Sequence, residues 1–181
     1  MRAAGGRRRR EAIEMKKMLI VVYSWSNGNT RKIAELLQKK TGADLAVIDT
    51  VKPYPSDYDR TVMQGQYEVE NGILPEIKPL DRDPADYDVI AVGSPTWWYT
   101  IAPAVKTFFA GADLTGKTLI PFTTNGGWPG HAVKDMKKAA KGAESTLEMQ
   151  IRFDSTGGAR METKPEAIEE WTERVRKYLE S

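Results

Sequence analysis

The stretch MLIVVYSWSNGNTRKIAELLQKK, residues 18–40, decides the fold because it joins a strand, a loop and a helix in one run. Residues 18–23 are almost entirely apolar, as is typical of a strand covered on both faces of a parallel sheet. Residues 31–40 carry apolar side chains at helical spacing, and Gly42 follows as a stop signal. A buried strand followed directly by a helix predicts the first half of a βαβ unit.

Strand-like and helical patterns alternate strictly through the rest of the chain. Parallel strands joined through helices make right-handed crossovers, which place helices on both faces of one sheet. We therefore expect an α/β fold with three layers, built on a doubly wound sheet of five parallel strands. The predicted strands are residues 18–23, 44–49, 87–93, 117–123 and 146–151, and the predicted helices are residues 31–40, 56–70, 102–110, 131–140 and 163–179.

The last part of the chain carries clear local signals. Leu147, Met149 and Ile151 alternate with polar residues, as expected of a strand at the edge of the sheet. Thr163 and Glu166 form a capping-box pattern, which predicts a side-chain cap at the start of the last helix. In residues 56–70, Tyr58, Val62, Met63 and Tyr67 lie at near-helical spacing. In the last helix we expect Ile168, Trp171, Val175 and Leu179 to be buried.

The composition limits the classes of protein that the chain can represent. Its 181 residues suffice for one domain with a sizeable core, and 40% are hydrophobic and 29% charged. It contains no cysteine, which excludes disulfide bonds, thiolate nucleophiles and cysteine-ligated metal clusters. No apolar run is long enough to cross a membrane. We expect a cytoplasmic protein with no metal site and with neither nucleic acid nor membrane as a partner.

Positive charge is concentrated at the amino terminus. Residues 1–17 hold seven of the 27 basic side chains and two of the 25 acidic ones, so residues 18–181 carry 20 basic and 23 acidic side chains, a net charge of −3. The basic stretch does not lead into a long apolar segment, so we do not expect it to be an export signal. We expect residues 1–17 to be a dispensable extension, with Met15 or Met18 as the natural start, and residues 18–181 to be the folded domain.

The loop between the first predicted strand and helix reads YSWSNGNT, residues 23–30. In a doubly wound sheet, ligands bind outside the carboxyl ends of the strands, where the winding direction reverses. The unpaired N–H groups and the dipole at the start of the next helix attract an anion there, and Gly28 lets the backbone turn closely around it. The loop lacks the lysine of a Walker A loop and the three glycines of a dinucleotide fingerprint. Its hydroxyl and amide groups therefore predict either a site for one phosphate group or a polar turn that only caps the helix.

Two further loops favour the phosphate site. The third predicted strand ends in GSPTWWYT, residues 93–100, and adjacent tryptophans at the mouth of a parallel sheet suit stacking on a flat aromatic ligand. We expect one of Trp97 and Trp98 to fill the core and the other to face that ligand. The fourth predicted strand ends in TTNGGWPGH, residues 123–131, whose glycines allow a close backbone approach. The three loops together predict a site for flavin mononucleotide (FMN).

With these loops, the chain resembles the flavodoxin-like family of FMN-binding proteins. Residues 23–30 resemble the phosphate loop of that family, with one extra residue before Gly28. Residues 93–109 and 121–130 resemble its first and second flavin-ring loops. The resemblance covers about residues 18–180. It implies the flavodoxin strand order 2-1-3-4-5, with FMN bound where strands 1 and 3 diverge.

By position, the resemblance implies that the first loop holds the phosphate group and the two later loops hold the ring system. Two departures from the family pattern are visible. The second ring loop has Asn-Gly-Gly-Trp in place of a tyrosine with acidic neighbours, and no glycine lies between Ser94 and Thr100. The residues implied to bind FMN are Ser24, Trp25, Ser26, Asn27, Gly28, Asn29, Thr30, Pro95, Thr96, Trp97, Trp98, Thr123, Thr124, Asn125, Gly126 and Gly127.

Two functions fit such a site. The first is an electron-transfer protein that shuttles electrons between redox partners through bound FMN. The second is an NAD(P)H-dependent FMN reductase of quinones or other small acceptors, and either could act as a monomer or a homodimer. Because the flavin carries the redox chemistry, no catalytic residue is predicted. His131, the only histidine, is expected at the surface beside the second ring loop, and the acidic body is expected to attract basic redox partners.

Overall fold

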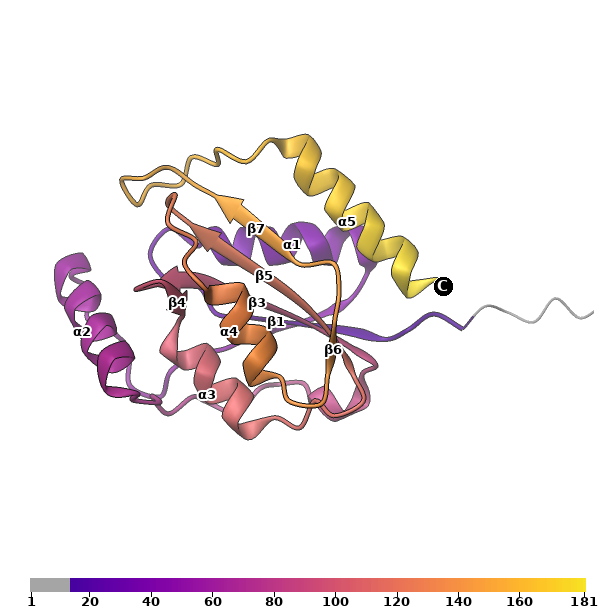
Figure 1. Ribbon diagram of the computed structural model, residues 1–181, viewed down its shortest axis with the longest axis horizontal. Coiled ribbons are helices and arrows are strands. Elements are labelled where there is room, and N and C mark those ends of the chain that lie inside the picture. Colours follow the sequence, from indigo (N-terminus) through magenta and orange to yellow (C-terminus); the bar gives the residue numbers. More distant parts are fainter. Residues whose placement is uncertain (1–13) are drawn as a thin grey trace, which may run out of the picture.

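The computed structural model describes residues 14–181 and has a parallel sheet at its centre (Figure 1). The strands of this sheet are β1 (Met18–Val22), β2 (Asp44–Val47), β3 (Val89–Trp97), β5 (Thr118–Asn125), β6 (Glu144–Ser145) and β7 (Met149–Arg152). They lie in the order β2-β1-β3-β5, and β6 and β7 share the last position because each pairs with β5 in parallel. This arrangement matches the order 2-1-3-4-5, so the predicted α/β fold class is confirmed.

Helices cover both faces of the sheet (Figure 1). The helices α1 (Asn29–Thr41) and α5 (Pro165–Leu179) pack on one face. The helices α3 (Pro103–Gly111) and α4 (Ala132–Ala139) pack on the other. The helix α2 (Tyr58–Asn71) lies at the end of the body toward which the strands point.

Strand β1 shows why its apolar run is continuous. Leu19 and Val21 belong to the core cluster beneath α3 and α4, whereas Ile20 and Val22 belong to the cluster beneath α1 and α5. All four side chains are fully buried. A strand that alternated polar and apolar residues would place polar side chains in one of these two cores.

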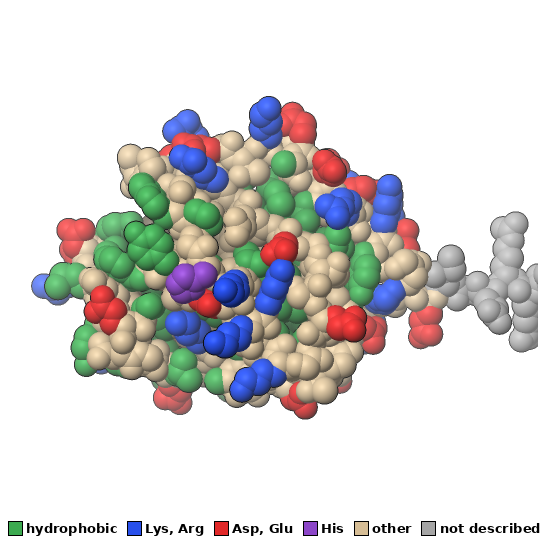
Figure 2. All heavy atoms as spheres, in the orientation of Figure 1, with side chains coloured by type: hydrophobic (Ala, Val, Ile, Leu, Met, Phe, Trp, Pro, Cys, Tyr) green, Lys and Arg blue, Asp and Glu red, His purple; other side chains and the backbone are tan. Residues whose placement is uncertain are grey.

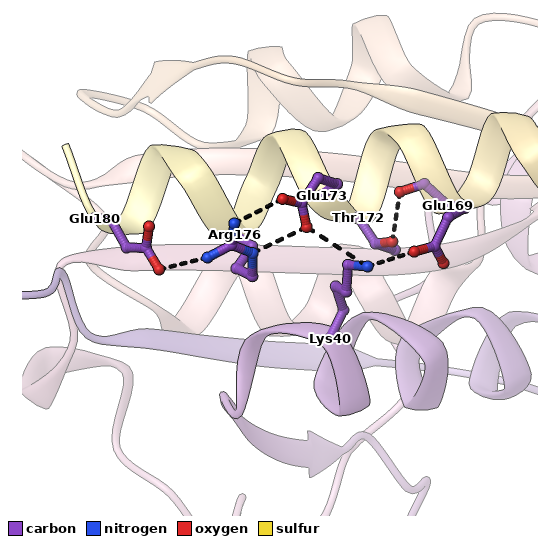
Figure 3. Close-up of polar contacts among 6 residues, drawn as sticks. All are labelled: Lys40, Glu169, Thr172, Glu173, Arg176 and Glu180. Atoms are coloured by element: carbon purple, nitrogen blue, oxygen red, sulfur yellow. Dashed lines mark hydrogen bonds and ion pairs between the residues drawn. The ribbon is translucent and has the colours of Figure 1, made fainter.

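Charged side chains join α1 to α5 (Figure 3). Lys40 of α1 forms ion pairs with Glu169 and Glu173 of α5. Arg176 binds Glu173 and Glu180 along the same helix. The hydrogen bonds from Arg176 lower the pKa of Glu173 to about 2. These groups are partly exposed, so water screens their attraction and the gain in stability is modest.

Helix α5 begins differently from the sequence expectation. Its N-cap is Lys164, and no side chain caps the helix, so the predicted capping box is wrong. The hydroxyl of Thr163 instead accepts a hydrogen bond from the backbone N–H of Arg152, at 2.8 Å. Thr163 therefore bonds to the backbone at the end of β7 and does not cap the helix as the sequence pattern predicted. The expected burial of Ile168, Trp171, Val175 and Leu179 is confirmed.

The start of the described chain is bonded to the domain. The backbone N–H of Lys16 donates to the carbonyl of Leu179, at 2.9 Å, and that of Lys17 donates to the carboxylate of Asp88, at 2.9 Å. Most of the predicted extension, residues 1–13, lies outside the described residues. Within residues 14–181, no helix combines the length and the apolar character that crossing a membrane requires.

Candidate functional site

A cleft of about 300 Å³ lies at the carboxyl ends of β1, β3, β5 and β7. This is the edge of the sheet at which doubly wound folds bind their ligands. Most of the residues predicted to bind FMN line the cleft. These residues are Trp25, Ser26, Asn29, Thr30, Pro95, Thr96, Trp97, Trp98, Thr124, Asn125 and Gly126.

The other five predicted residues lie behind or beside this lining. The hydroxyl oxygens of Ser24 and Thr123 are buried. Asn27 and Gly28 form the turn that leads into α1, and Gly127 lies further along the second ring loop. The structure therefore brings all three predicted loops to one place.

The first loop turns sharply before α1. Ser26 has a φ of 62° and Gly28 a φ of 71°, so both lie in the left-handed region. This conformation is uncommon for serine, and such strain is concentrated at functional sites. Helix α1 has no acidic side chain in its first turn, so the positive end of its dipole is free to attract an anion.

Four buried side-chain oxygens among residues 14–181 have no hydrogen-bond partner, and all four belong to the predicted site. They are Ser24 Oγ, Asn29 Oδ1, Thr96 Oγ1 and Thr123 Oγ1. Buried polar atoms in folded proteins are nearly always paired, either within the protein or with a bound molecule. Their concentration at one edge of the sheet indicates a polar ligand, and oxygen acceptors and hydroxyl donors fit the phosphate and polar ring edge of FMN.

The two adjacent tryptophans occupy different environments. Trp97 packs against the core, and its ring makes edge-on contacts with those of Tyr23, Trp25 and Tyr54 at centroid distances of 5.7, 6.3 and 5.3 Å. Trp98 is 40% exposed, and its Nε1 donates to the carbonyl of Val62 at 3.1 Å. Both rings line the cleft, so one tryptophan forms a packed wall and the other an accessible rim.

A short hairpin fixes the first ring loop. Strand β4 (Thr100–Ile101) folds back on the end of β3 through the two-residue turn Trp98-Tyr99. Both turn residues have positive φ values, 49° and 65°, as a tight hairpin turn of this length requires. The second ring loop holds the turn in place, since the backbone N–H of His131 donates to the carbonyl of Tyr99 at 2.8 Å.

His131 lies at the surface, as expected, and does not line the cleft. Its Nδ1 pairs with the carboxylate of Asp135, which also accepts a hydrogen bond from the hydroxyl of Thr100. Partial burial acts to raise the pKa of Asp135, but the bonds from Thr100 and His131, with the nearby charge of Lys106, lower it overall. Asp135 is therefore ionised at neutral pH and joins α4 to the hairpin.

No pattern in the sequence indicates that α2 forms one wall of the cleft. Tyr58, Thr61, Val62 and Gly65 line it from this helix. The helix turns its small and polar residues inward and leaves Tyr58, Met63 and Tyr67 exposed. The hydrophobic spacing therefore predicted the helix but did not show which of its faces packs against the rest of the domain.

The loop after β7 was also missed as part of the site. Gly157 and Gly158 line the cleft, and their carbonyls accept hydrogen bonds from the side-chain amides of Asn27 and Asn29, at 2.6 and 3.0 Å. This loop follows the last strand at the same edge of the sheet. Two adjacent glycines after a predicted strand were the signal that could have revealed it.

One carboxylate holds the loop in shape. Asp154 accepts hydrogen bonds from the backbone N–H groups of Thr156, Gly158 and Arg160, at 3.1, 3.0 and 3.2 Å. Together with the hydroxyl of Thr156, these donors lower the pKa of Asp154 to about 2. Asp154 also lines the cleft, but its oxygens are engaged by its own loop.

Among the described residues 14–181, none that lines the cleft is cationic. The buried groups behind it also stay neutral or paired: burial raises the pKa of Tyr23 and of Tyr54 well above the ordinary range. The hydroxyl of Tyr54 donates to the buried carboxylate of Glu68 at 2.6 Å, and Gln64 donates to the other oxygen at 3.1 Å. Among residues 14–181, no three His, Cys, Asp or Glu side chains gather as a metal site would require. The arrangement suits an organic anion held by neutral donors.

The sequence model of the flavodoxin family matches residues 17–173. The chain belongs to the flavodoxin family. The match includes every loop that lines the cleft, which confirms the resemblance noted from the sequence. No curated protein sequence matches the chain.

Solved structures of flavoproteins share this fold. A candidate flavoprotein from Bacteroides eggerthii is 29% identical, with a TM-score of 0.70 over 88% of this chain and 98% of that one. A flavoprotein from Lactobacillus acidophilus, solved in complex with FMN, is 26% identical, with a TM-score of 0.65 over 75% of this chain and 92% of that one. A flavodoxin from the Archaea is 16% identical and has a TM-score of 0.56, which shows the fold alone.

Proposed function

We propose that this protein binds FMN in the cleft and transfers electrons between redox partners. The observation that carries the proposal is the group of four buried, unpaired oxygens at the edge of the sheet, all on residues of the three predicted loops. Membership of the flavodoxin family and the FMN complex of the Lactobacillus acidophilus flavoprotein support the choice of FMN. When bound, FMN supplies the redox chemistry, accepting one or two electrons.

The protein's own groups bind and orient this cofactor. The backbone at Ser26 and Gly28 and the start of α1 form the anion site, and the side chains of Ser24 and Asn29 offer further polar contacts. Trp97, packed edge-on among other aromatic rings, gives a flat apolar wall for a ring system. A neutral lining favours binding through directed hydrogen bonds rather than through net charge.

The first experiment is an absorption spectrum of the purified protein, followed by removal of any flavin and titration with FMN. We expect flavin bands in the spectrum, or their recovery on reconstitution, with saturation at one FMN per chain. A protein that binds no FMN under these conditions would contradict the proposal.

Anaerobic addition of NADH and NADPH to the same sample separates a carrier from a reductase. We expect the flavin bands to persist, because a carrier depends on a separate protein as its electron donor. Rapid bleaching by either nucleotide alone would replace the carrier with the NAD(P)H-dependent reductase and direct the search to quinones and other small acceptors.

A further inference from the structure

Exposed aromatic side chains extend from the cleft to the start of α4. Trp98 is 40% exposed, Tyr99 is 55% exposed and Trp128 is 61% exposed. We call these three residues the aromatic strip. The loop that carries Trp128 lies directly against the hairpin turn at Gly130, where an added Cβ atom would lie 2.2 Å from the carbonyl oxygen of Tyr99. Tryptophan and tyrosine at a surface lose contact with water when a partner covers them, and they dominate binding energy at protein interfaces.

Lysine side chains lie beside this strip. Lys106 belongs to α3, and Lys134 and Lys138 belong to α4, where a spacing of four residues places them on one face. We call these three residues the basic flank. In the part of the chain that the structure describes, none of the three forms an ion pair. Their charges are therefore available to a partner.

The two surfaces are adjacent on one face of the molecule. Figure 2 shows the single histidine, His131, in purple between hydrophobic side chains on one side and Lys and Arg side chains on the other. Glu148 is paired with Lys137, and the one negative charge of Asp135, which is bonded to His131 and Thr100, is outnumbered by the three lysines of the basic flank. This face is therefore locally positive, although residues 18–181 as a whole are net acidic.

We propose that the aromatic strip and the basic flank form the docking surface for an acidic redox protein. The proposal rests on the proposed function, because its partner exchanges electrons with FMN in the adjacent cleft. It reverses the expectation of basic partners, which considered only the net charge of the domain. In each encounter one reduced partner loses one electron and FMN gains it. Two encounters, with two protons from water, account for the full two-electron reduction.

The spread of the lysines favours a protein over a phosphorylated nucleotide. The basic flank belongs to two helices, and none of its members lines the cleft. One or two phosphate groups would be held by cations that converge on one point, whereas a protein surface can meet separated charges. The exposed tryptophan and tyrosine of the strip supply the apolar centre that protein interfaces usually have.

The test measures binding of the FMN-loaded full chain to an oxidised acidic [2Fe–2S] ferredoxin, with basic cytochrome c as the opposite-charge probe. Both proteins start oxidised, so the readout is affinity and not turnover. The test variant is Lys134→Glu/Lys138→Glu. The matched control is Lys39→Glu/Lys177→Glu, which changes the net charge equally at exposed positions of α1 and α5, across the sheet. The arginines of residues 1–13 are present in wild type and in every variant, so their effect on affinity is the same in each.

We expect the wild-type protein to bind ferredoxin more tightly than cytochrome c. Raising NaCl from 20 to 200 mM is expected to lower its affinity for ferredoxin by about tenfold. Lys134→Glu/Lys138→Glu is expected to lower the affinity for ferredoxin by about tenfold at low salt. The control variant is expected to lower it by less than about twofold. Trp128→Ala is expected to weaken it at both salt concentrations, because the lost contact is apolar.

Equal effects of the test and control variants would overturn the proposal, because they would show attraction to net charge alone. Tighter binding of cytochrome c than of ferredoxin would overturn it as well. A variant that loses affinity for NADPH and not for ferredoxin would assign the lysines to a nucleotide. FMN titration of each variant keeps this result separate from the proposed function: unchanged FMN affinity with no ferredoxin binding rejects the docking surface alone.

Discussion

The ring of Trp97 packs against Gly65 of α2, where an added Cβ atom would lie 3.0 Å from Trp97 Cε3. Gly65 is buried, so a side chain there must displace the ring or the helix. Tyr23 and Tyr54 also contact the ring and restrict its movement. This one contact therefore sets both the position of α2 and the shape of the cleft.

We expect Gly65→Val to raise the FMN dissociation constant by about tenfold, because overpacking costs about 1–3 kcal/mol and disturbs the wall that Trp97 forms. Fluorescence titration with FMN measures the effect. The matched control is Gly111→Val, since Gly111 is also a helical glycine but an added Cβ atom there meets open space. FMN affinity equal to wild type in both variants would contradict the structural role of this contact.

Ser24→Ala removes one of the buried hydroxyls that lack a partner. We expect weaker FMN binding by about fivefold, the value of one hydrogen bond of about 1 kcal/mol, and no loss of stability in the cofactor-free protein. FMN titration and urea unfolding of the apoprotein measure the two quantities. Ser145→Ala, at an exposed position of β6, serves as the control. A less stable apoprotein with unchanged FMN affinity would show that the hydroxyl is structural.

Asp154→Ala is expected to loosen the loop after β7 and to weaken FMN binding, because the loop positions the carbonyls that bond to Asn27 and Asn29. Its backbone donors lose their shared acceptor, at a cost of about 1–3 kcal/mol. Hydrogen exchange of residues 154–160 at pH 7 reports the loop directly. Asp113→Ala is the matched control, because Asp113 likewise accepts from the backbone N–H of Thr115 and does not line the cleft. Equal exchange in wild type and Asp154→Ala would refute this role.

The lowered pKa of Glu173 predicts that the stability of the fold depends on pH, whether or not the cofactor is bound. Its pKa in the folded protein is about 2, below the ordinary value of 4.5. Its ionised form therefore stabilises the fold above about pH 4.5, and this contribution is lost as the pH falls toward 2. We expect Glu173→Gln to be slightly less stable than wild type at pH 7, and the difference to disappear at low pH.

Urea unfolding across this pH range measures the effect, with FMN affinity expected to stay unchanged. Glu170→Gln is the control, because Glu170 lies on the same helix and forms no ion pair within residues 14–181. A difference between wild type and Glu173→Gln that stays constant from pH 7 to pH 2 would exclude ionisation of Glu173 as its cause.

The fold was predictable because its strands are buried on both faces. Such strands appear in the sequence as continuous apolar runs, and the runs at residues 18–22 and 89–93 leave no other assignment for the centre of the sheet. The three loops after β1, β3 and β5 were predictable for the same reason, because parallel strands end at one edge. Polar and aromatic residues in those positions indicated a ligand before any distance was known.

The remaining parts of the site depend on packing that a linear pattern does not express. Helix α2 packs through Thr61, Gly65 and Glu68, which are small or polar, so its hydrophobic spacing gave no information about its inner face. The role of Thr163 depended on a backbone partner in β7 rather than on its neighbours in sequence. The net charge of the domain likewise does not show where its charges lie, and Lys106, Lys134 and Lys138 come together through the packing of α3 and α4.

The cleft draws on residues from Trp25 to Gly158, and this separation affects the protein during its synthesis. Asn27 and Asn29 leave the ribosome early, but the carbonyls that they bond belong to Gly157 and Gly158. Until that loop and helix α5 emerge, the nascent chain has an incomplete site and uncovered aromatic side chains. The cleft is therefore complete only after nearly the whole chain has been released.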